Sequence, residues 1–195
     1  MSQLPQHVEG AGETGEATFC FVNGAEKCAL TAALSKHAAA FNPTFVHINR
    51  AEKALSTHCQ APCLSYVTSL SHHRASENGH VYVPAQNQYP IWNFFYGTLA
   101  DREVLSEKLD LHTPPDLRPA IVQGSMQIWA GTYKALVDGD DTVTGWAYEV
   151  VSAEHEDVLR HYETEQYETV RCRIFMQDID ECIMGLTFRF SGDCG

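Results

Sequence analysis

Two short stretches of this sequence hold residue types, at suitable spacings, that could do chemistry. The first runs from Phe95 to Asp101 (FYGTLAD), where an apolar segment stops at a glycine and a helix is expected to begin. Backbone amides at such a turn, next to a helix N-terminus, can bind an anion. The alternative interpretation is that Gly97 only permits the chain to turn.

The second stretch is LRHYETEQY at residues 159–167. Glu163 follows Leu159 by four residues, so one helical turn puts its carboxylate on the side of a leucine that faces the core. Apolar surroundings disfavour the charged form and raise the pKa of a carboxyl group, which suits it to carry protons near neutral pH. Two alternatives stay open: Glu163 is an ordinary solvent-exposed residue at a helix end, or the nearby Glu165 or Glu168 takes the role.

The commonest catalytic patterns are absent from the sequence. It has no Gly-x-Ser-x-Gly elbow, no P-loop, no dinucleotide-binding glycine motif and no His-Glu-x-x-His. Cys172 is expected in the middle of a strand, where a cysteine is more often a small core residue than a nucleophile. An enzyme with this sequence is therefore expected to work without a protein nucleophile, a metal or any other cofactor.

The elements that must position these residues follow from the hydrophobic pattern of the last half of the chain. We expect strands at 91–96, 120–129, 132–137, 142–151, 167–176 and 182–190, with a turn at Asp138–Asp141. Helices are expected at 101–109 and from Ser152 to about Glu163, the second burying Val158, Leu159 and Tyr162. This order predicts an α+β fold: a small curved mixed β-barrel with flanking helices.

The composition suggests three zones. Residues 1–17 are expected to form a disordered tail and residues 91–193 the main domain. Between them, residues 18–90 form an extension of unknown role, with a strand at 18–24, a helix at 25–41, a helical turn or two at 50–56 and a loop at 68–90.

Charge narrows the choice of partners. The chain has 13 Lys and Arg against 25 Asp and Glu, a formal net charge of -12, which makes binding to nucleic acid or to anionic membranes a poor expectation. No apolar run approaches the ~20 residues that span a bilayer, and the first residues do not resemble a signal peptide. We therefore expect a soluble, cytoplasmic protein.

The seven cysteines are expected to be reduced thiols, because their number is odd. A zinc site could be imagined at Cys59, Cys63, His72 and His73, but their spacing matches no named metal motif. No metal is expected there.

From Ile91 to Asp193 the sequence resembles the gamma-glutamylcyclotransferase-like family, in particular the branch of avirulence-induced plant proteins, and fungal members with an N-terminal extension. The stretches that carry the resemblance are FFYGTLADREVL, WAGTYKALV, VTGWAYEV, LRHYETEQYETV and LTFRFSGD. The resemblance implies a curved mixed β-barrel and cleavage of a gamma-glutamyl amide by internal cyclisation, which gives 5-oxoproline and a free amine.

The resemblance also implies residue roles. Glu163 would be the catalytic acid and base, and the loop made of Tyr96, Gly97, Thr98, Leu99, Ala100 and Asp101 would hold the gamma-glutamyl group. Tyr167, Tyr133 and Arg171 lie on strand faces opposite the expected core residues and could line the cavity, or pack elsewhere on the surface or barrel. Many family members have a glycine-containing turn after the glutamate, whereas this chain has Thr164, so the specificity for the amine stays open.

The expected partner is a small gamma-glutamyl substrate, and a homodimer is possible. Two further functions stay open beside the general cyclotransferase. One is a tailoring enzyme that removes gamma-glutamyl from a single glutathione-derived metabolite. The other is a non-catalytic ligand-binding module on the same fold, although such a module would have no need of the Glu163 carboxylate.

Overall fold

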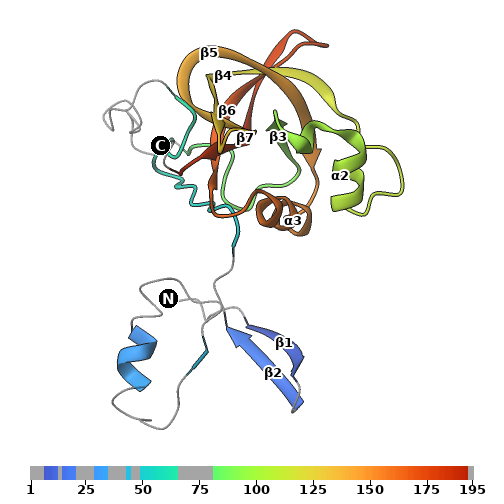
Figure 1. Ribbon diagram of the computed structural model, residues 1–195. Coiled ribbons are helices and arrows are strands. Elements are labelled where there is room, and N and C mark those ends of the chain that lie inside the picture. The colour runs from blue at the N-terminus through green and yellow to red at the C-terminus, as the bar shows by residue number, and fades with distance from the viewer. Residues whose placement is uncertain are drawn as a thin grey trace. The chain divides into compact units, whose positions relative to one another are not determined.

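The structure is a computed structural model that describes residues 7–12, 15–20, 29–34, 43–44, 49–65 and 81–192 (Figure 1). The chain divides into two compact units, Met1–His47 and Ile48–Gly195. This division coincides with neither of the boundaries expected near residues 17 and 90.

The first unit contains two antiparallel strands, β1 (His7–Gly12) and β2 (Gly15–Cys20). Residues 29–34 are helical. Strand β1 occupies residues for which a tail was expected, and the helical residues fall inside the helix expected at 25–41.

The second unit is built on a closed barrel of five strands in the order β3-β5-β4-β6-β7. Its strands are β3 (Ile91–Phe95), β4 (Arg118–Trp129), β5 (Tyr133–Val150), β6 (Tyr167–Met176) and β7 (Glu181–Phe190). The neighbours β3 and β7 are parallel and the other pairs antiparallel, so the sheet is mixed. The fold predicted from the sequence, a small mixed β-barrel with flanking helices, is confirmed.

Two hydrophobic clusters lie on opposite faces of the sheet, and β3 contributes to both, as its mainly apolar sequence predicts. Phe94 belongs to a cluster supplied mainly by the strands, together with Val122, Leu136, Ile174 and Met176. Phe95 belongs to a cluster that also includes helix residues: Leu105, Leu109 and Leu159. The strand that leads into the Gly97 loop is therefore fixed from both sides.

Strand β5 is a correction to the sequence prediction. Two strands separated by a turn at Asp138–Asp141 were expected, but a single strand runs through these residues and curves over the barrel (Figure 1). The pairing with β4 shifts register between Gln123 and Ser125, so the acidic residues form a bulge instead of a turn. Side-chain contacts hold this bulge, since Ser125 donates to Asp141 (2.6 Å) and Arg189 donates to Asp138 (2.8 Å).

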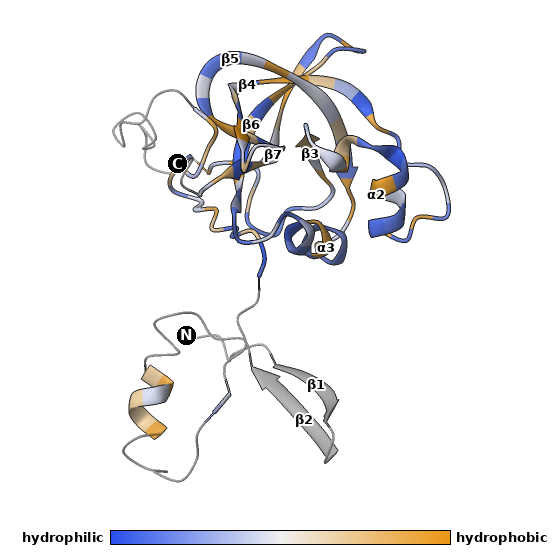
Figure 2. Ribbon diagram, in the orientation of Figure 1, coloured by the Kyte–Doolittle hydropathy of each residue, from blue (hydrophilic) through white to orange (hydrophobic). Residues whose placement is uncertain are grey.

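Two helices flank the barrel, α2 (Arg102–Lys108) and α3 (Ala153–Glu163). Ser152 caps α3 as predicted, because its hydroxyl accepts from the amide of His155. Figure 2 shows hydrophilic and hydrophobic residues on both helices, and Leu159 of α3 is fully buried. Val158 was expected on the same buried face but is 41% exposed, so that expectation is wrong.

Residues 49–65, which we call the arm, run along β6 in the same unit. Strand β4 reaches only the far end of β6, at Phe175 and Met176, and leaves the first half of that edge without a strand partner. The arm fills this gap: the amide of Thr169 donates to Glu52 (2.6 Å), and that of Arg171 to Pro62 (3.0 Å). The helical turn expected at 50–56 is wrong, because this backbone pairs with a strand edge.

Arg171 of β6 holds the arm in place through hydrogen bonds. Its side chain is fully buried, and its guanidinium donates to the carbonyls of Ser56, Cys59, Gln60 and Pro84. A buried charge must be satisfied by hydrogen bonds, and backbone carbonyls supply them here. This explains why β6 is buried on both faces from Thr169 to Cys172, where simple alternation was expected.

Candidate active site

The glycine loop follows β3 directly. Thr98–Ala100 form a single 3-10 turn (η2), and Asp101 then caps α2 by accepting from the amides of Glu103 and Val104. Leu99 is buried and anchors the turn. Within the turn, Ala100 donates to the carbonyl of Gly97 and Asp101 to that of Thr98, so the first amides have no acceptor inside the turn.

The space over Gly97 is open. A methyl group built on Gly97 would meet no atom within 4 Å, and the φ of this residue is -107°. The glycine is therefore not required by a left-handed backbone or by crowding from the protein itself. Open space beside amides that have no acceptor within the turn is what close approach of an anionic or carbonyl ligand needs.

Glu163 is the last residue of α3. The helix stops there because Thr164 takes φ 67° and ψ -178°, a conformation that favours glycine. The Glu163 side chain is half-buried, and burial raises its pKa from 4.5 to about 7. In the part of the chain that the structure describes, its carboxylate has no hydrogen-bond or ion-pair partner, so nothing stabilises its charged form.

The structure brings the loop and this end of α3 together. Tyr162, the neighbour of Glu163, donates a hydrogen bond to the hydroxyl of Thr98 (3.0 Å). Burial raises the pKa of Tyr96, and the negative charge of Glu163 and then the hydroxyl of Tyr167 raise it further. These interactions place Tyr96, Glu163 and Tyr167 within electrostatic reach of one another.

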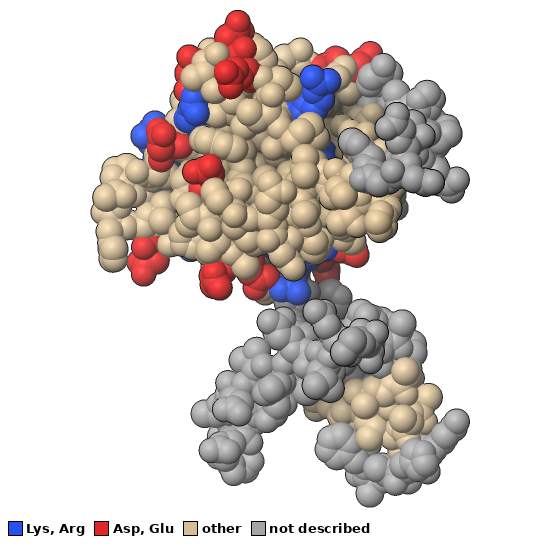
Figure 3. Space-filling view, turned by 180° about the vertical axis from the view of Figure 1, so that it is seen from behind, with Lys and Arg blue, Asp and Glu red and all other residues tan. Residues whose placement is uncertain are grey.

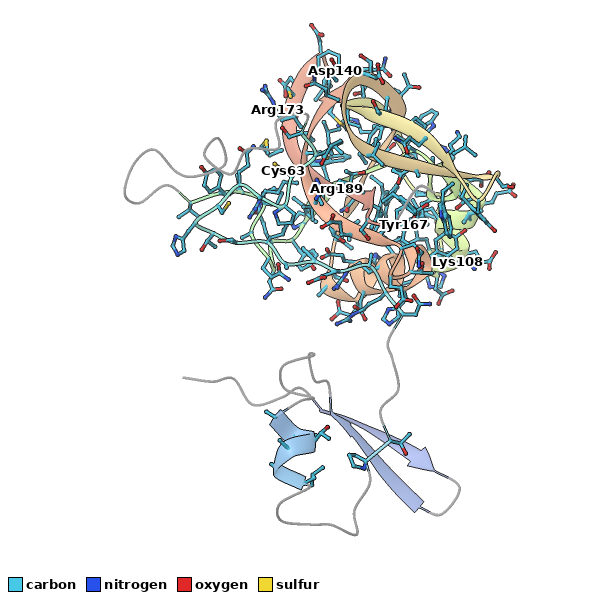
Figure 4. The ribbon with its side chains drawn as sticks, turned by 60° about the vertical axis from the view of Figure 1, so that its left-hand side comes forward. Cys63, Lys108, Asp140, Tyr167, Arg173 and Arg189 are labelled. Carbon is cyan, nitrogen blue, oxygen red and sulfur yellow. The ribbon has the colours of Figure 1, made fainter. Side chains whose placement is uncertain are left out.

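Tyr96 itself is held firmly. Its ring is buried, and its hydroxyl donates to the carbonyl of Phe188 on β7 (2.8 Å). Figure 4 places Tyr167 and Lys108 at one end of the barrel and Asp140 and Arg173 at the other. Lys108 Nζ lies 5.6 Å from the Tyr162 ring, so this is the end that carries Thr98 and Glu163.

The two competing glutamates have different surroundings. Glu165 is exposed. Glu168 is paired with Arg189 (2.9 Å), which also contacts Asp138 and the Cys63 carbonyl. Of the three carboxylates, Glu163 alone is half-buried and without a described partner, which favours it as the proton carrier.

The three secondary candidates separate in the structure. Tyr167 is half-buried beside Tyr96, and its hydroxyl donates to the Lys134 carbonyl (3.2 Å). Tyr133 is largely exposed. Arg171 is buried beneath the arm, so it holds the arm and does not line a substrate site.

The arm contacts α3 through residues for which no sequence pattern predicted a role. Lys53 Nζ forms a buried ion pair with Glu156 (2.7 Å), and Tyr89 also donates to that carboxylate. Arg160 Nε donates to the Ala51 carbonyl (2.8 Å). The helix that carries Glu163 is thus tied to a segment about a hundred residues earlier, a pairing that no local pattern indicates.

The zinc site considered at Cys59, Cys63, His72 and His73 is described only in part by the structure. His72 and His73 lie outside the described residues, and burial raises the pKa of the Cys63 thiol. Among the residues described, no group of three or more His, Cys, Asp or Glu side chains is arranged to hold a metal ion. Within those same residues, no helix has the length and apolar character to cross a bilayer.

The fold and the site define a class of protein. A closed five-stranded mixed barrel with a few helices beside it is the arrangement expected of a gamma-glutamylcyclotransferase-like protein. Residues 93–188 match the model of the family described as gamma-glutamyl cyclotransferase, AIG2-like. Through these residues the chain belongs to that family, which supports a gamma-glutamyl cyclotransferase-like function in general.

Solved structures that match part of the chain include two Arabidopsis thaliana proteins determined in solution. One is 22% identical with a TM-score of 0.47, and the match covers 54% of this chain and 66% of that one. The other is 24% identical with a TM-score of 0.46, and the match covers 52% of this chain and 69% of that one. No curated protein matches the chain.

Proposed function

We propose that the protein is a gamma-glutamyl amide cyclotransferase that releases 5-oxoproline and a free amine. The observation that carries the proposal is the Glu163 carboxyl group. It is half-buried beside the open Gly97 loop, and its pKa of about 7 lets it both accept and return a proton near neutral pH. Family membership of residues 93–188 supports the same chemistry.

The reaction begins with a proton transfer. The carboxylate of Glu163 takes a proton from the α-ammonium group of the substrate, and the freed amine attacks the γ-carbonyl carbon. A new C–N bond closes a five-membered ring, and the negative charge moves to the carbonyl oxygen. Backbone amides of the loop from Gly97 to Leu99 stabilise that oxyanion or hold the substrate carboxylate.

The old amide bond then breaks. Protonated Glu163 passes its proton to the departing nitrogen as the carbonyl re-forms. The α-ammonium group of the substrate starts with three hydrogens. One stays on the lactam nitrogen, and Glu163 carries the other two to the departing amine, one after the other. No protein nucleophile is needed, because the attacking group belongs to the substrate, and a well-oriented internal attack saves about 7–11 kcal/mol.

The test is to incubate the protein with a panel of gamma-glutamyl peptides and amines and to measure 5-oxoproline. Glu163→Gln keeps the shape of the side chain and removes the proton carrier, so we expect turnover to disappear while substrate binding by calorimetry remains. Glu165→Gln is the matched control, because it makes the same change at an exposed residue nearby.

Three results bear on the proposal. Loss of turnover in Glu163→Gln alone supports it. Full activity in that variant removes Glu163 from the mechanism. Binding of gamma-glutamyl compounds by the wild-type protein with no 5-oxoproline formed would mean that the fold serves here as a ligand-binding module.

A further inference from the structure

Four aromatic side chains form a continuous row that starts at the candidate site. Tyr167 meets Phe190 edge-on with ring centroids 5.5 Å apart, and Phe190 lies 5.3 Å from Trp129. Trp129 in turn lies 5.8 Å from Tyr133. We call Tyr167, Phe190, Trp129 and Tyr133 the aromatic row.

The row is carried outward by the hairpin between β4 and β5. Trp129 and Tyr133 are direct cross-strand partners, so their side chains project from the same face of the hairpin. Between them, Ala130 and Gly131 both have positive φ, 50° and 71°, which turns the chain tightly. Ile128, the neighbour of Trp129, therefore projects from the opposite face.

Exposure increases outward from Phe190 along the row. Phe190 is buried, Tyr167 and Trp129 are half-buried, and Tyr133 is 60% exposed. The exposed rings of the row adjoin one another, and adjoining apolar area that stays in water is what a ligand can cover. Phe190 is already packed against its neighbours, whereas Tyr133 has exposed apolar area that a ligand can contact.

Tyr167 joins the row to the site. Its hydroxyl lies within electrostatic reach of Tyr96, which also feels the charge of Glu163, and it donates to the Lys134 carbonyl on the hairpin. A gamma-glutamyl group held at the Gly97 loop has its amide bond near Glu163. Whatever is attached to the amide nitrogen then continues past Tyr167 toward Trp129 and Tyr133.

The charge of the hairpin indicates the kind of group that fits. The whole chain has a net charge of -12, and Figure 3 shows acidic side chains scattered over one face of the second unit. Residues 126–134 (MQIWAGTYK), in contrast, contain no acidic residue and one lysine. A cationic amine would find no carboxylate along this hairpin. A flat, uncharged apolar group would gain contact with the rings.

We propose that the aromatic row is the binding site for the leaving amine, and that the preferred substrates are gamma-glutamyl amides of aromatic or other flat apolar amines. This inference rests on the proposed function. It adds what that function leaves open, which is the chemical class of the amine.

The test compares three substrates that differ only in the amine: gamma-glutamyl phenethylamide, gamma-glutamyl ethylamide and the gamma-glutamyl amide of 1,5-diaminopentane, which is cationic. For the wild-type protein we expect kcat/KM for the phenethylamide to exceed that for each of the others by roughly tenfold, in the range that burying an aromatic ring supplies. Tyr133→Ala and Trp129→Leu should each lower that ratio about threefold or more, as the loss of one ring contact predicts.

Ile128→Ala is the matched control, because Ile128 and Tyr133 are both 60% exposed on one hairpin but lie on opposite faces. It should leave the ratio unchanged, and thermal melting should show that all three variants are folded. Tyr133→Ala alone suffices if Trp129→Leu does not fold, since Tyr133 is mainly in solvent.

The outcomes separate this inference from the proposed function. If none of the amides is cyclised, the proposed function fails. If the amides are cyclised equally, or the cationic amide is preferred, the function stands and the aromatic row is not the amine site. A change in sedimentation of Tyr133→Ala with unchanged selectivity would also overturn the inference, because the row would then cover a second copy of the chain.

Discussion

Replacing Glu163 by glutamine should stabilise the folded protein by an amount that grows as the pH rises from about 4.5 and is complete above about pH 7. Burial disfavours the ionised carboxylate, so the folded protein keeps the Glu163 proton up to about pH 7, whereas a solvated glutamate loses it near 4.5. Between these values the folded state binds more protons than the unfolded state. The free energy of unfolding of the wild type therefore falls as the pH rises through this window.

The magnitude follows from the two pKa values. A difference between 4.5 and about 7 corresponds to about 3 kcal/mol at about 1.4 kcal/mol for each pH unit. Below the lower pKa the wild type and Glu163→Gln both carry a neutral side chain, and their stabilities should be similar. Above pH 7 the variant no longer holds a buried charge and should be more stable by up to about 3 kcal/mol.

Urea denaturation of wild type and Glu163→Gln at about pH 5 and about pH 8 measures this difference, because other titrating groups cancel in the comparison. Glu165→Gln, at an exposed position, should show no such dependence on pH. If Glu163→Gln changes stability equally at both pH values, or destabilises more at the higher one, the carboxylate is solvated or paired and the reasoning is wrong.

Three further predictions concern the surroundings of the site. Gly97→Ala should change stability by less than about 0.5 kcal/mol, because its methyl group meets no atom within 4 Å. The same methyl group should lower kcat/KM, because it limits the approach of substrate to the loop amides, and equal activity would show that substrate does not approach there. Thr164→Gly should stabilise the protein by about 1 kcal/mol in thermal unfolding, because φ 67° with ψ -178° is a glycine conformation; unchanged or lower stability would contradict the strain. Lys53→Met should cost about 3–5 kcal/mol, because the buried Glu156 charge keeps the Tyr89 hydroxyl as a donor but loses its cation, and adding Glu156→Leu should recover much of it; an additive second loss would refute this.

Much of the barrel was predictable because its signals are local. The mainly apolar stretch at Ile91–Phe95 indicated a strand buried on both faces, and Ser152 indicated where α3 begins. Both elements end where the candidate chemistry lies. Only the family resemblance predicted that the Gly97 loop and Glu163 lie near each other. More than sixty residues separate them, and nothing in that spacing predicts a contact.

The structural features that the sequence did not predict depend on contacts between residues that are far apart in the chain. The run from Asp138 to Asp141 has the composition of a turn, but pairing with β4 carries β5 straight through it. Residues 50–56 have no strand pattern, and the open edge of β6 makes them extended. Arg171 looked like an outward-facing strand residue, and only the arm above it explains its burial.

The pH dependence of kcat/KM for 5-oxoproline release tests the central claim most directly, because it reports the ionisation of the free enzyme's essential base. With Glu163 as that base, kcat/KM should rise with pH through an apparent pKa near 7, and Glu163→Gln should remove the activity that defines this limb. A profile that is already level from about pH 5 upward, or a limb near pH 7 that persists in Glu163→Gln, would contradict the account.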